Sequence, residues 1–584
     1  MDHVKWDQDT RYTDILREIS KERLWEYTQQ IARYRRETGS EGERLAMEYI
    51  QKTLEGYGVP AQMLKFDLFL GLPEDGEIAV SALGGEVIHG RPPSFSAPTP
   101  KEGLVAELVY VGNGSVEELN RVDIRGKLAF LDSIAAPPLA RQIEDRGAIG
   151  QIYCGGENIR EMIVTSIWGT PTPETAWRIP RSHILSVSRK DGERLKGALS
   201  GGKTSVRLTV NTFVGWKPVH MVVADIRGSA EPERYTLLGG HVDSWHYGAT
   251  DNGTTNAAMI ETARVLNLNR SKLRRGLKIG FWTGHSQGRY AGSTWYADNH
   301  WEDLYNHCVG NITFDLLGGI GCDNFAKFPR LASTKACGAR AIGEITGQRS
   351  EGIPFGRAGD QSFWGIGIPS LFGVLSRPRE DQPDVAAGLK SLLGDAGFPW
   401  WWHTIHDTID KVDHDILFKG TQVMSLAACY FCMNTILPLD FVEAGQEIVD
   451  LLRELNGEAG ERFSLDNTIR IAETFVKKSG LLYEAIHRVD SANSGKTESI
   501  NRTLMKLSRT LVPIVQTAAS PFDHDLALPF KRLPALQPVR NLKGIDPVSG
   551  EPGFIKARLV RERNRVEHAL LEAGQSVEAA LKEL

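Results

Sequence analysis

Three predicted strands in the middle of the chain are each followed by residues that can bind a divalent metal. The strands span residues 235–239, 277–283 and 311–314. The histidines and carboxylates that come after them are His241, Asp243, Asp251, His285 and Asp315. Neutral imidazole and carboxylate groups are the usual nitrogen and oxygen ligands of catalytic divalent metals. Because ligands in an open parallel sheet bind beyond the carboxyl ends of the strands, we expect these side chains to share one crevice, which His403 could complete.

The surrounding sequence predicts the elements that position this crevice. Between about residues 213 and 439, strand-like apolar runs alternate with helical patterns, which is typical of βαβ units in a parallel sheet. A helix is predicted at 254–266, directly after the loop that contains Asp251, and a buried strand at 367–372. The predicted fold class is therefore α/β, with a mostly parallel sheet flanked by helices.

The sequence patterns on either side of this α/β region predict different secondary structure. From about 70 to 214, short β-type runs are separated by glycine and proline residues, whereas the chain beyond 440 is mostly helical in pattern. In that helical part, residues 529–550 read as an irregular stretch and 554–584 as a charged helix or helix pair.

Two helices outside these patterns are also predicted. Ser40 and Glu43 form a capping box before an amphipathic run. The most apolar long window, 423–439, is short for a membrane span, so we expect a buried helix. Cys429 and Cys432 lie in this window with CxxC spacing, but without a second pair, which favours core packing over redox or zinc chemistry.

Composition narrows the function classes. The chain has 584 residues, too many for one hydrophobic core, so about two to four domains are expected. Apolar residues make up 41% and charged residues 24%, and the formal net charge is −5, as in ordinary soluble proteins. No long basic run is present, which disfavours a nucleic-acid partner. The polar start of the chain has no apolar leader, so we expect a cytoplasmic protein without a membrane partner.

The chain resembles the co-catalytic zinc peptidase family that includes the bacterial aminopeptidases and glutamate carboxypeptidase, with the transferrin receptor as a non-catalytic relative. The family pattern HxD…GAxDN…WxxEExGxxGS…D…HTxxDT can be laid along separate stretches, in order, over most of the chain. They are 241–243, 248–252, 282–293, Asp315 and 403–408. The supporting residues Gly288, Gly292 and Ser293 are present.

The resemblance implies a domain plan. A peptidase-like α/β domain would comprise residues 1–70 and 215–440. A β-rich protease-associated insert at 71–214 would help to roof the active site. A helical dimerisation domain at 441–584 would make the protein a homodimer.

The resemblance also implies roles for the candidate residues. Those that match its metal ligands are His241, Asp251, Asp315 and His403. Asp251 would bridge two metals and be joined to Asn252 by a cis peptide bond. Asp243 would contact a ligand and fix its ring orientation, and His406 is a weaker second candidate in the last motif.

A purely structural role remains open for each of these residues. His241 could be a loop histidine hydrogen-bonded to an aspartate, and Asp251 could belong to the start of the following helix. Asp315 could cap a neighbouring loop, and the ring of His403 could stack on the adjacent tryptophans. Those tryptophans, at 400–402, could themselves wall an aromatic pocket together with Trp245 and Trp364, or pack in the core.

The chain departs from the family at its most important position. The family's two adjacent glutamates serve as the general base and as a ligand of the second metal, and His285 and Ser286 stand in their place. Serine is a poor ligand, so we expect one metal per chain. His285 could accept protons near neutral pH in place of the base, or it could bind the metal. The alternative is that the site has lost its catalytic function, as in the receptor branch of the family, and that His285 and Ser286 have no chemical role.

The sequence therefore predicts a metal-dependent hydrolase that cleaves an amide or related C–N bond in a small molecule or short peptide. The metal would polarise the carbonyl and activate a bound water. Zinc is the expected cofactor, although imidazole with carboxylates also suits iron or manganese. The alternatives are a mononuclear-metal enzyme of another class, such as a C–C hydrolase or a lyase, and a non-catalytic binding protein.

Overall fold

Three parallel strands at the centre of one large sheet end at the predicted metal ligands. The computed structural model of the chain describes residues 3–7, 11–379, 397–528, 530–543 and 550–584. The three strands are β8 (Glu231–His241), β9 (Arg275–Trp282) and β10 (Cys308–Thr313). β8 pairs in parallel with both of its neighbours, as predicted from the alternation of strands and helices.

Helices cover both faces of these strands, which explains why the strands are apolar on both sides. Leu238 and Ile279 pack toward α7 (Thr254–Leu268) and α12 (His414–Met433). Leu237 faces the opposite side, toward α8 (Ala291–Asn299) and α9 (Trp301–His307). The other elements of this part of the chain are α1 (Arg11–Arg17), α2 (Lys21–Ala32), α3 (Glu41–Gly56), α10 (Lys335–Thr346), β11 (Pro329–Arg330), β12 (Ile353–Pro354) and β13 (Ser370–Leu371). The α/β fold class is confirmed.

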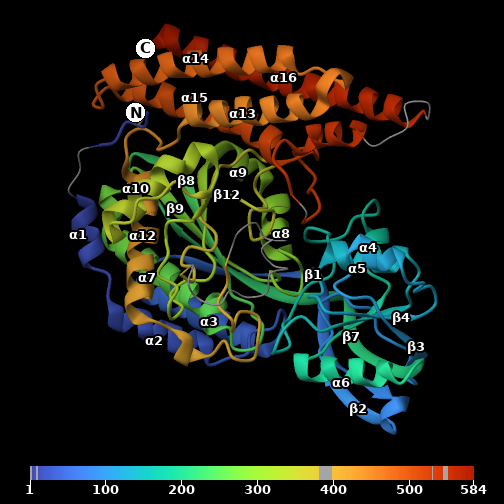
Figure 1. Ribbon diagram of the computed structural model, residues 1–584. Coiled ribbons are helices and arrows are strands. Elements are labelled where there is room, and N and C mark those ends of the chain that lie inside the picture. Colours follow the sequence, from blue (N-terminus) through green and yellow to red (C-terminus); the bar gives the residue numbers. More distant parts are fainter. Residues whose placement is uncertain (1–2, 8–10, 380–396, 529, 544–549) are drawn as a thin grey trace.

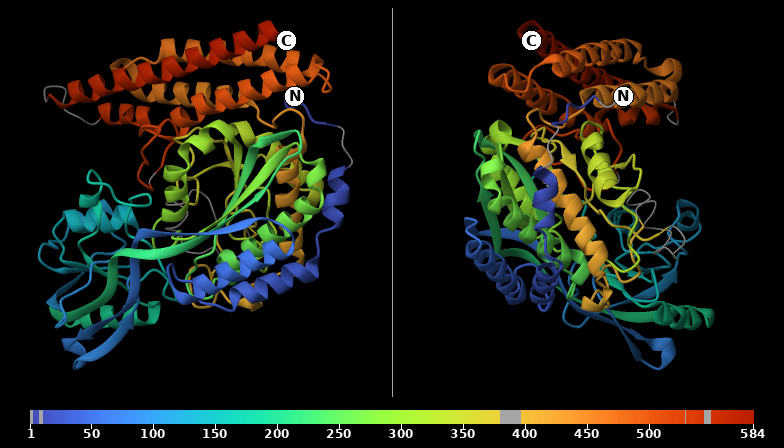
Figure 2. Two further views of the ribbon diagram at one scale, coloured as in Figure 1. Left: turned by 180° about the vertical axis from the view of Figure 1, so that it is seen from behind. Right: turned by 90° about the vertical axis from the view of Figure 1, so that its left-hand side faces the viewer.

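Two long antiparallel strands join the central body to the insert. β1 (Ala61–Val80) and β7 (Thr204–Ile226) pair along almost their whole length, from Ala61 opposite Ala224 to Val80 opposite Val206. Figure 2 shows them crossing from one body to the other. The predicted boundaries at 70/71 and 214/215 therefore fall inside continuous strands, and the sheet runs through both parts.

The insert is a smaller α/β unit. Its parallel strands β3 to β6 extend the sheet beyond β7. Its elements are β2 (Glu86–Gly90), β3 (Leu104–Tyr110), β4 (Leu128–Leu131), β5 (Gly150–Tyr153), β6 (His183–Ser186), α4 (Val116–Asn120), α5 (Pro137–Asp145) and α6 (Arg189–Ser200). The insert therefore contains short strands, as the β-type runs between 70 and 214 predicted, and it also contains the three α-helices α4, α5 and α6.

The most apolar helix of the chain is a core element. α12 is long and apolar enough to cross a membrane by length and composition, but 83% of its apolar window is buried inside the protein. Cys429 and Cys432 are buried in it as free thiols, so the prediction of core packing for this pair is confirmed.

The start of α3 differs from the predicted capping box. The Ser40 side chain accepts from the Glu43 N–H, as expected. The Glu43 carboxylate, however, accepts from the Gly39 N–H (2.7 Å) and from Thr283 Oγ1 (2.6 Å) rather than from the Ser40 N–H. Because Thr283 follows β9 directly, this buried carboxylate ties α3 to the loop that carries His285.

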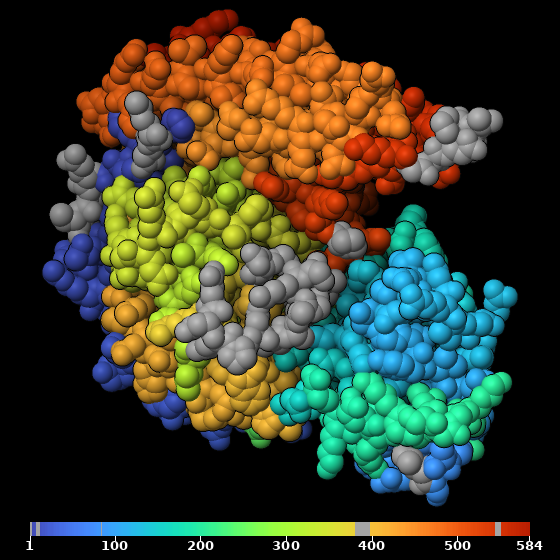
Figure 3. All heavy atoms as spheres, in the orientation of Figure 1, coloured from blue at the N-terminus to red at the C-terminus, as the bar shows by residue number. Residues whose placement is uncertain are grey.

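The C-terminal part forms a helical layer across one end of the central body (Figure 1). Its helices are α13 (Phe441–Ala459), α14 (Asp466–Arg488), α15 (Ser494–Gln516) and α16 (Glu551–Glu583). The prediction of an irregular stretch at 529–550 is wrong for Pro534–Lys543, which form a 3₁₀ helix. The segment after α15 reaches the insert, where the Ala527 N–H donates to the Ser166 carbonyl (2.8 Å), and the layer and the insert flank the central body (Figure 3).

Candidate metal centre

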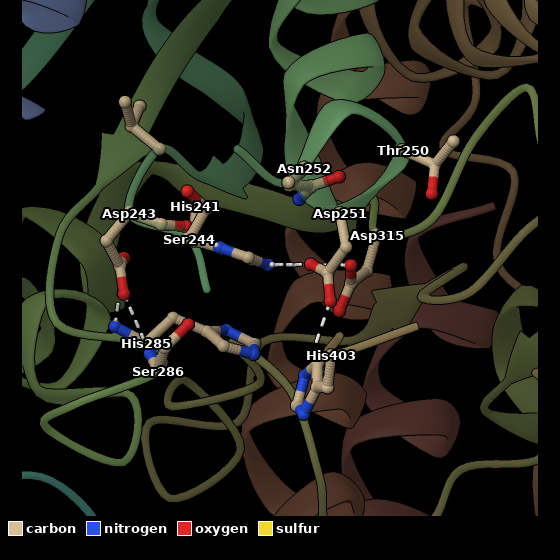
Figure 4. Close-up of polar contacts among 12 residues, drawn as sticks. His241, Asp243, Ser244, Thr250, Asp251, Asn252, His285, Ser286, Asp315 and His403 are labelled. Atoms are coloured by element: carbon tan, nitrogen blue, oxygen red, sulfur yellow. Dashed lines mark hydrogen bonds and ion pairs between the residues drawn. The ribbon is translucent and has the colours of Figure 1, made fainter. Parts of the chain in front are cut away.

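The predicted ligands converge at the carboxyl ends of β8, β9 and β10 (Figure 4). His241 Nε2 lies 3.2 Å from Asp251 Oδ1 and 3.5 Å from Asp315 Oδ1. His403 Nε2 lies 3.3 Å from the other oxygen of Asp251. Asp251 thus sits between the two histidines, as a bridging carboxylate would.

His285 belongs to the same cluster. One ligand atom each from His241, His285 and Asp315 can be chosen so that all three lie within 4.8 Å of one another. The rings of His241 and His285 are stacked, with centroids 3.8 Å apart and planes at 18°. His285 is therefore close enough either to bind a metal held by His241 and Asp315 or to move a proton beside it.

Two buried polar atoms of the cluster have no hydrogen-bond partner among the described residues and could bind a cation. His241 Nε2 and Asp315 Oδ1 are buried and have no hydrogen-bond partner among the described residues, an arrangement that costs free energy unless a further group completes it. Burial alone would lower the pKa of His241, but the Asp315 and Asp251 carboxylates outweigh it and hold that pKa well above its usual range. The set of imidazole and carboxylate donors is thus arranged to share a positive charge, which a divalent metal would supply.

Asp407 holds the Asp251 loop. Its carboxylate accepts hydrogen bonds from Thr250 N (2.9 Å), Thr250 Oγ1 (2.8 Å) and Asp251 N (2.9 Å), and burial raises its pKa to about 7. The peptide bond between Asp251 and Asn252 is cis, as the family resemblance implied. The HTxxDT motif therefore contributes the candidate ligand His403. Its aspartate, Asp407, holds the loop that carries a second candidate ligand, Asp251.

Arg36 fixes the other end of this loop and was not predicted. Its guanidinium is fully buried and donates to the carbonyls of Val242 (2.8 Å), Tyr247 (2.7 Å) and Gly248 (2.9 Å). Arg36 lies about 200 residues before the loop, so nothing in the local sequence pattern could have revealed the contact.

Asp243 supports the site through both its backbone and its side chain. It does fix the His241 ring, but with its backbone carbonyl, which lies 2.7 Å from His241 Nδ1. Its carboxylate instead accepts from the backbone N–H groups of His285 (3.1 Å) and Ser286 (2.8 Å) and from Thr38 Oγ1 (3.0 Å). Asp243 therefore contacts the candidate ligand through its backbone, and its side chain holds the loop after β9.

Asp360 orients His285 and was also missed. Its Oδ2 lies 2.8 Å from His285 Nδ1, and its Oδ1 accepts from Ser293 Oγ (2.7 Å). Burial by itself would raise the pKa of Asp360, but the His285 charge outweighs it and lowers that pKa. With Nδ1 engaged in this way, His285 Nε2 is the nitrogen left to serve the cluster.

The insert fixes His403. His403 Nδ1 lies 2.7 Å from the Glu161 carbonyl, and the Glu161 N–H donates back to the His403 carbonyl (2.8 Å). The imidazole also stacks on Trp402, with centroids 3.6 Å apart, so the stacked arrangement and the place beside Asp251 occur together. His406 is not in the cluster; its ring nitrogen contacts Asn158 instead (3.3 Å).

A cavity of about 90 Å³ lies against the centre. Its described lining comprises Pro137, Met162, Ile163, His285, Ser286, Arg289, Tyr290, Asp315, Ala358, Gly359, Val374, Phe398, Trp402, His403 and Leu528. Residues of the insert, the central body and the C-terminal part all contribute. Among the tryptophans considered above, Trp402 lines it, Trp400 is 48% exposed, and Trp364 is buried beside Phe355.

Known proteins resemble both this fold and this sequence. Residues 221–428 match the model of peptidase family M28. The aminopeptidase from Aneurinibacillus sp. strain AM-1 superimposes with a TM-score of 0.53 at 21% identity, over 72% of this chain and 96% of that one. The zinc aminopeptidase of Bacillus subtilis gives 0.54 at 19% identity, over 70% and 95%.

Two curated relatives extend the sequence match. A probable lipoprotein aminopeptidase of Mycobacterium tuberculosis is 26% identical over 68% of this chain and 80% of its own length. A probable glutamate carboxypeptidase of Zea mays is 27% identical, over 39% of each chain. Residues 221–428 are therefore similar to peptidase family M28, and these similarities support a metallohydrolase that resembles aminopeptidases and carboxypeptidases.

Proposed function

We propose that the protein hydrolyses an amide or related C–N bond in a small molecule or short peptide, with one divalent metal, zinc, per chain. The observation that carries the proposal is the pair of unsatisfied buried atoms, His241 Nε2 and Asp315 Oδ1, beside Asp251. Relatives named as aminopeptidases and a carboxypeptidase support the reaction class, and a neighbour named as a zinc aminopeptidase supports the metal.

The proposed ligands are His241, Asp251 and Asp315, with His403 on the far side of Asp251. A divalent cation held there supplies Lewis acidity, which polarises the scissile carbonyl and activates water. Ser286 offers no carboxylate to a second cation, which supports a stoichiometry of one.

His285 is the proposed proton acceptor. Its Nδ1 is turned to Asp360, so Nε2 is the nitrogen that can exchange a proton at the centre. The same imidazole can return that proton to the leaving nitrogen. Trp402 and Phe398 stack on each other at the cavity wall and exclude water from one side of the reacting groups.

Metal analysis of the purified chain, paired with a hydrolysis assay, tests the proposal. We expect one zinc per chain, and cleavage of members of a dipeptide and N-acyl amino acid panel that stops after chelation and returns with zinc. Two metals at full occupancy, about 3.5–4 Å apart as in two-metal sites, would refute the single-metal centre. A chain that takes up no metal would refute the enzyme and favour a non-catalytic binding protein.

We also propose a cytoplasmic homodimer that pairs through residues beyond 440. Leu481, Phe554 and Leu571 on α14 and α16 are 54%, 79% and 51% exposed, and such apolar side chains are candidates for an interface. The free, buried cysteines suit a reducing compartment. Light scattering that shows a monomer at micromolar concentration would contradict the dimer, and fractionation of the native host would test the location.

A further inference from the structure

The loop after β9 has one residue more than the family pattern, and the extra length lies at the cavity. The pattern has two residues between its last two glycines, whereas this chain has Arg289, Tyr290 and Ala291 between Gly288 and Gly292. Arg289 and Tyr290 both have left-handed backbone, with φ of 50° and 66°. Residues other than glycine seldom adopt this conformation, and they do so preferentially at functional sites. Both side chains line the cavity.

The guanidinium of Arg289 is buried and has no carboxylate partner among the residues that the structure describes. The residue is 5% exposed. It donates from Nε to the Thr165 carbonyl (3.1 Å) and from Nη2 to the Ile163 carbonyl (2.9 Å), and its guanidinium also interacts with the side chain of the neighbouring Tyr290. Across the described ranges of the chain, no carboxylate lies within ion-pair distance of it. A buried charge of this kind is costly unless an opposite charge completes it, and Nη1 takes no part in the two carbonyl bonds.

The rest of the lining shows what kind of molecule could bring that charge. Met162, Ile163, Phe398, Trp402 and the aromatic ring of Tyr290 make most of the wall apolar. Among the described lining residues, Asp315 is the only carboxylate, and it is a proposed metal ligand. Within the described part of the chain, the cavity thus combines a guanidinium that has no carboxylate partner, an apolar wall and the candidate metal centre.

We propose that Arg289 binds a carboxylate group of the substrate. The substrate would then be a carboxylic acid with an aromatic or branched apolar body, placed so that its scissile bond meets the metal centre. This inference rests on the proposed hydrolysis and specifies its substrate class. A guanidinium binds carboxylate with strong, charge-assisted hydrogen bonds in a fixed geometry, and the two carbonyl bonds hold Arg289 in place for that contact.

Binding of two non-hydrolysable probes tests the inference. Titration calorimetry on the zinc-loaded full chain would compare 3-phenylpropanoate with 3-phenylpropanamide, which differ only in the charged group. We expect the acid to bind at least ~10-fold more tightly, in the range of charge-assisted hydrogen bonds. Arg289→Met should abolish the preference, whereas Arg289→Lys should retain part of it.

Arg160→Met is the matched control. Arg160 also donates to backbone carbonyls, those of Trp402 and Trp400, and it pairs with no carboxylate among the described residues, but it does not line the cavity. We expect Arg160→Met to keep the preference for the acid. If both variants lose the preference for the acid, hydrogen bonds from arginine side chains to backbone carbonyls, rather than the charge of Arg289, determine that preference. This result would overturn the inference.

Two further outcomes would also overturn it. If the unsubstituted protein binds the acid and the amide equally well, the inference is wrong. This outcome does not depend on whether any variant folds. A preference that survives Arg289→Met but disappears when zinc is removed would place the carboxylate on the metal. Because neither probe is hydrolysed, the test is separate from the proposed reaction: an intact acid preference with no cleavage of any peptide would refute the hydrolysis alone.

Discussion

The loops after β8 and β9 face each other across the candidate metal centre, equally well anchored but different in chemistry. Arg36 and Asp407 hold the first loop, which supplies His241 and Asp251. The second loop is held through the N–H groups of residues 285 and 286, which donate to the Asp243 carboxylate, and through the imidazole bond to Asp360. It nevertheless presents an imidazole and a hydroxyl where the family pattern has two carboxylates. The donor groups differ from the family pattern, while the hydrogen bonds that hold this loop are present.

The largest expected effect comes from the first loop. Asp251→Asn should reduce the bound zinc to near zero and hydrolysis to the level of the chelated protein, because a neutral amide replaces the carboxylate between His241 and His403. Metal analysis and the peptide assay measure both. Asp410→Asn, at a side chain that is 63% exposed, is the control and should change neither. Full zinc occupancy in Asp251→Asn would remove Asp251 from the ligand set.

His285→Ala tests the second loop directly. The expected result is a kcat lower by ~10²–10⁴-fold with the zinc content unchanged, because a general base is lost while the metal stays on other residues. His406→Ala, on an imidazole outside the cluster, should have little effect. Loss of zinc in His285→Ala would instead make His285 a ligand and end its assignment as the proton acceptor.

Asp360→Asn should have a smaller effect that separates positioning from binding. Removing a partner that orients a functional imidazole typically costs ~10–100-fold, and we expect this in kcat with KM nearly unchanged. Ser293→Ala removes the other hydrogen bond of Asp360 without touching His285, and should cost less. A rise in KM or a loss of thermal stability that accounts for the whole change would show that Asp360 serves the fold and not the imidazole.

The smallest expected effect is a gain. His285→Glu combined with Ser286→Glu restores the two carboxylates of the family pattern on a loop whose backbone is already held by Asp243. We expect the zinc content to rise from one toward two per chain, with some peptidase activity. A stoichiometry that stays at one would mean that the second metal position is blocked by more than these two side chains.

Much of the centre could be predicted because its ligands follow strands in a recognisable order. The types and positions of His241, Asp251 and Asp315 are local properties of strand ends, and the convergence of those ends follows from a parallel sheet. The replacement of the family's two glutamates by His285 and Ser286 could also be recognised from the sequence. The assignment of dimerisation, cytoplasmic location and the 71–214 domain boundaries stays a prediction.

The sequence by itself determined the donor groups, the α/β class and the absence of the two glutamates, because each depends on residue type and short-range periodicity. Only the tertiary structure decided what holds and completes the site. Arg36 meets Val242 across 206 residues of chain, Glu161 meets His403 across 242, and Asp360 meets His285 across 75. Arg289 could not be recognised as a buried cation until the insert was folded against it, where its guanidinium donates to the Thr165 and Ile163 carbonyls. A local sequence pattern shows which chemical groups are available. Their burial and their hydrogen-bond or ion-pair partners depend on contacts between distant segments, and burial and partners together set the free energies of the charged groups.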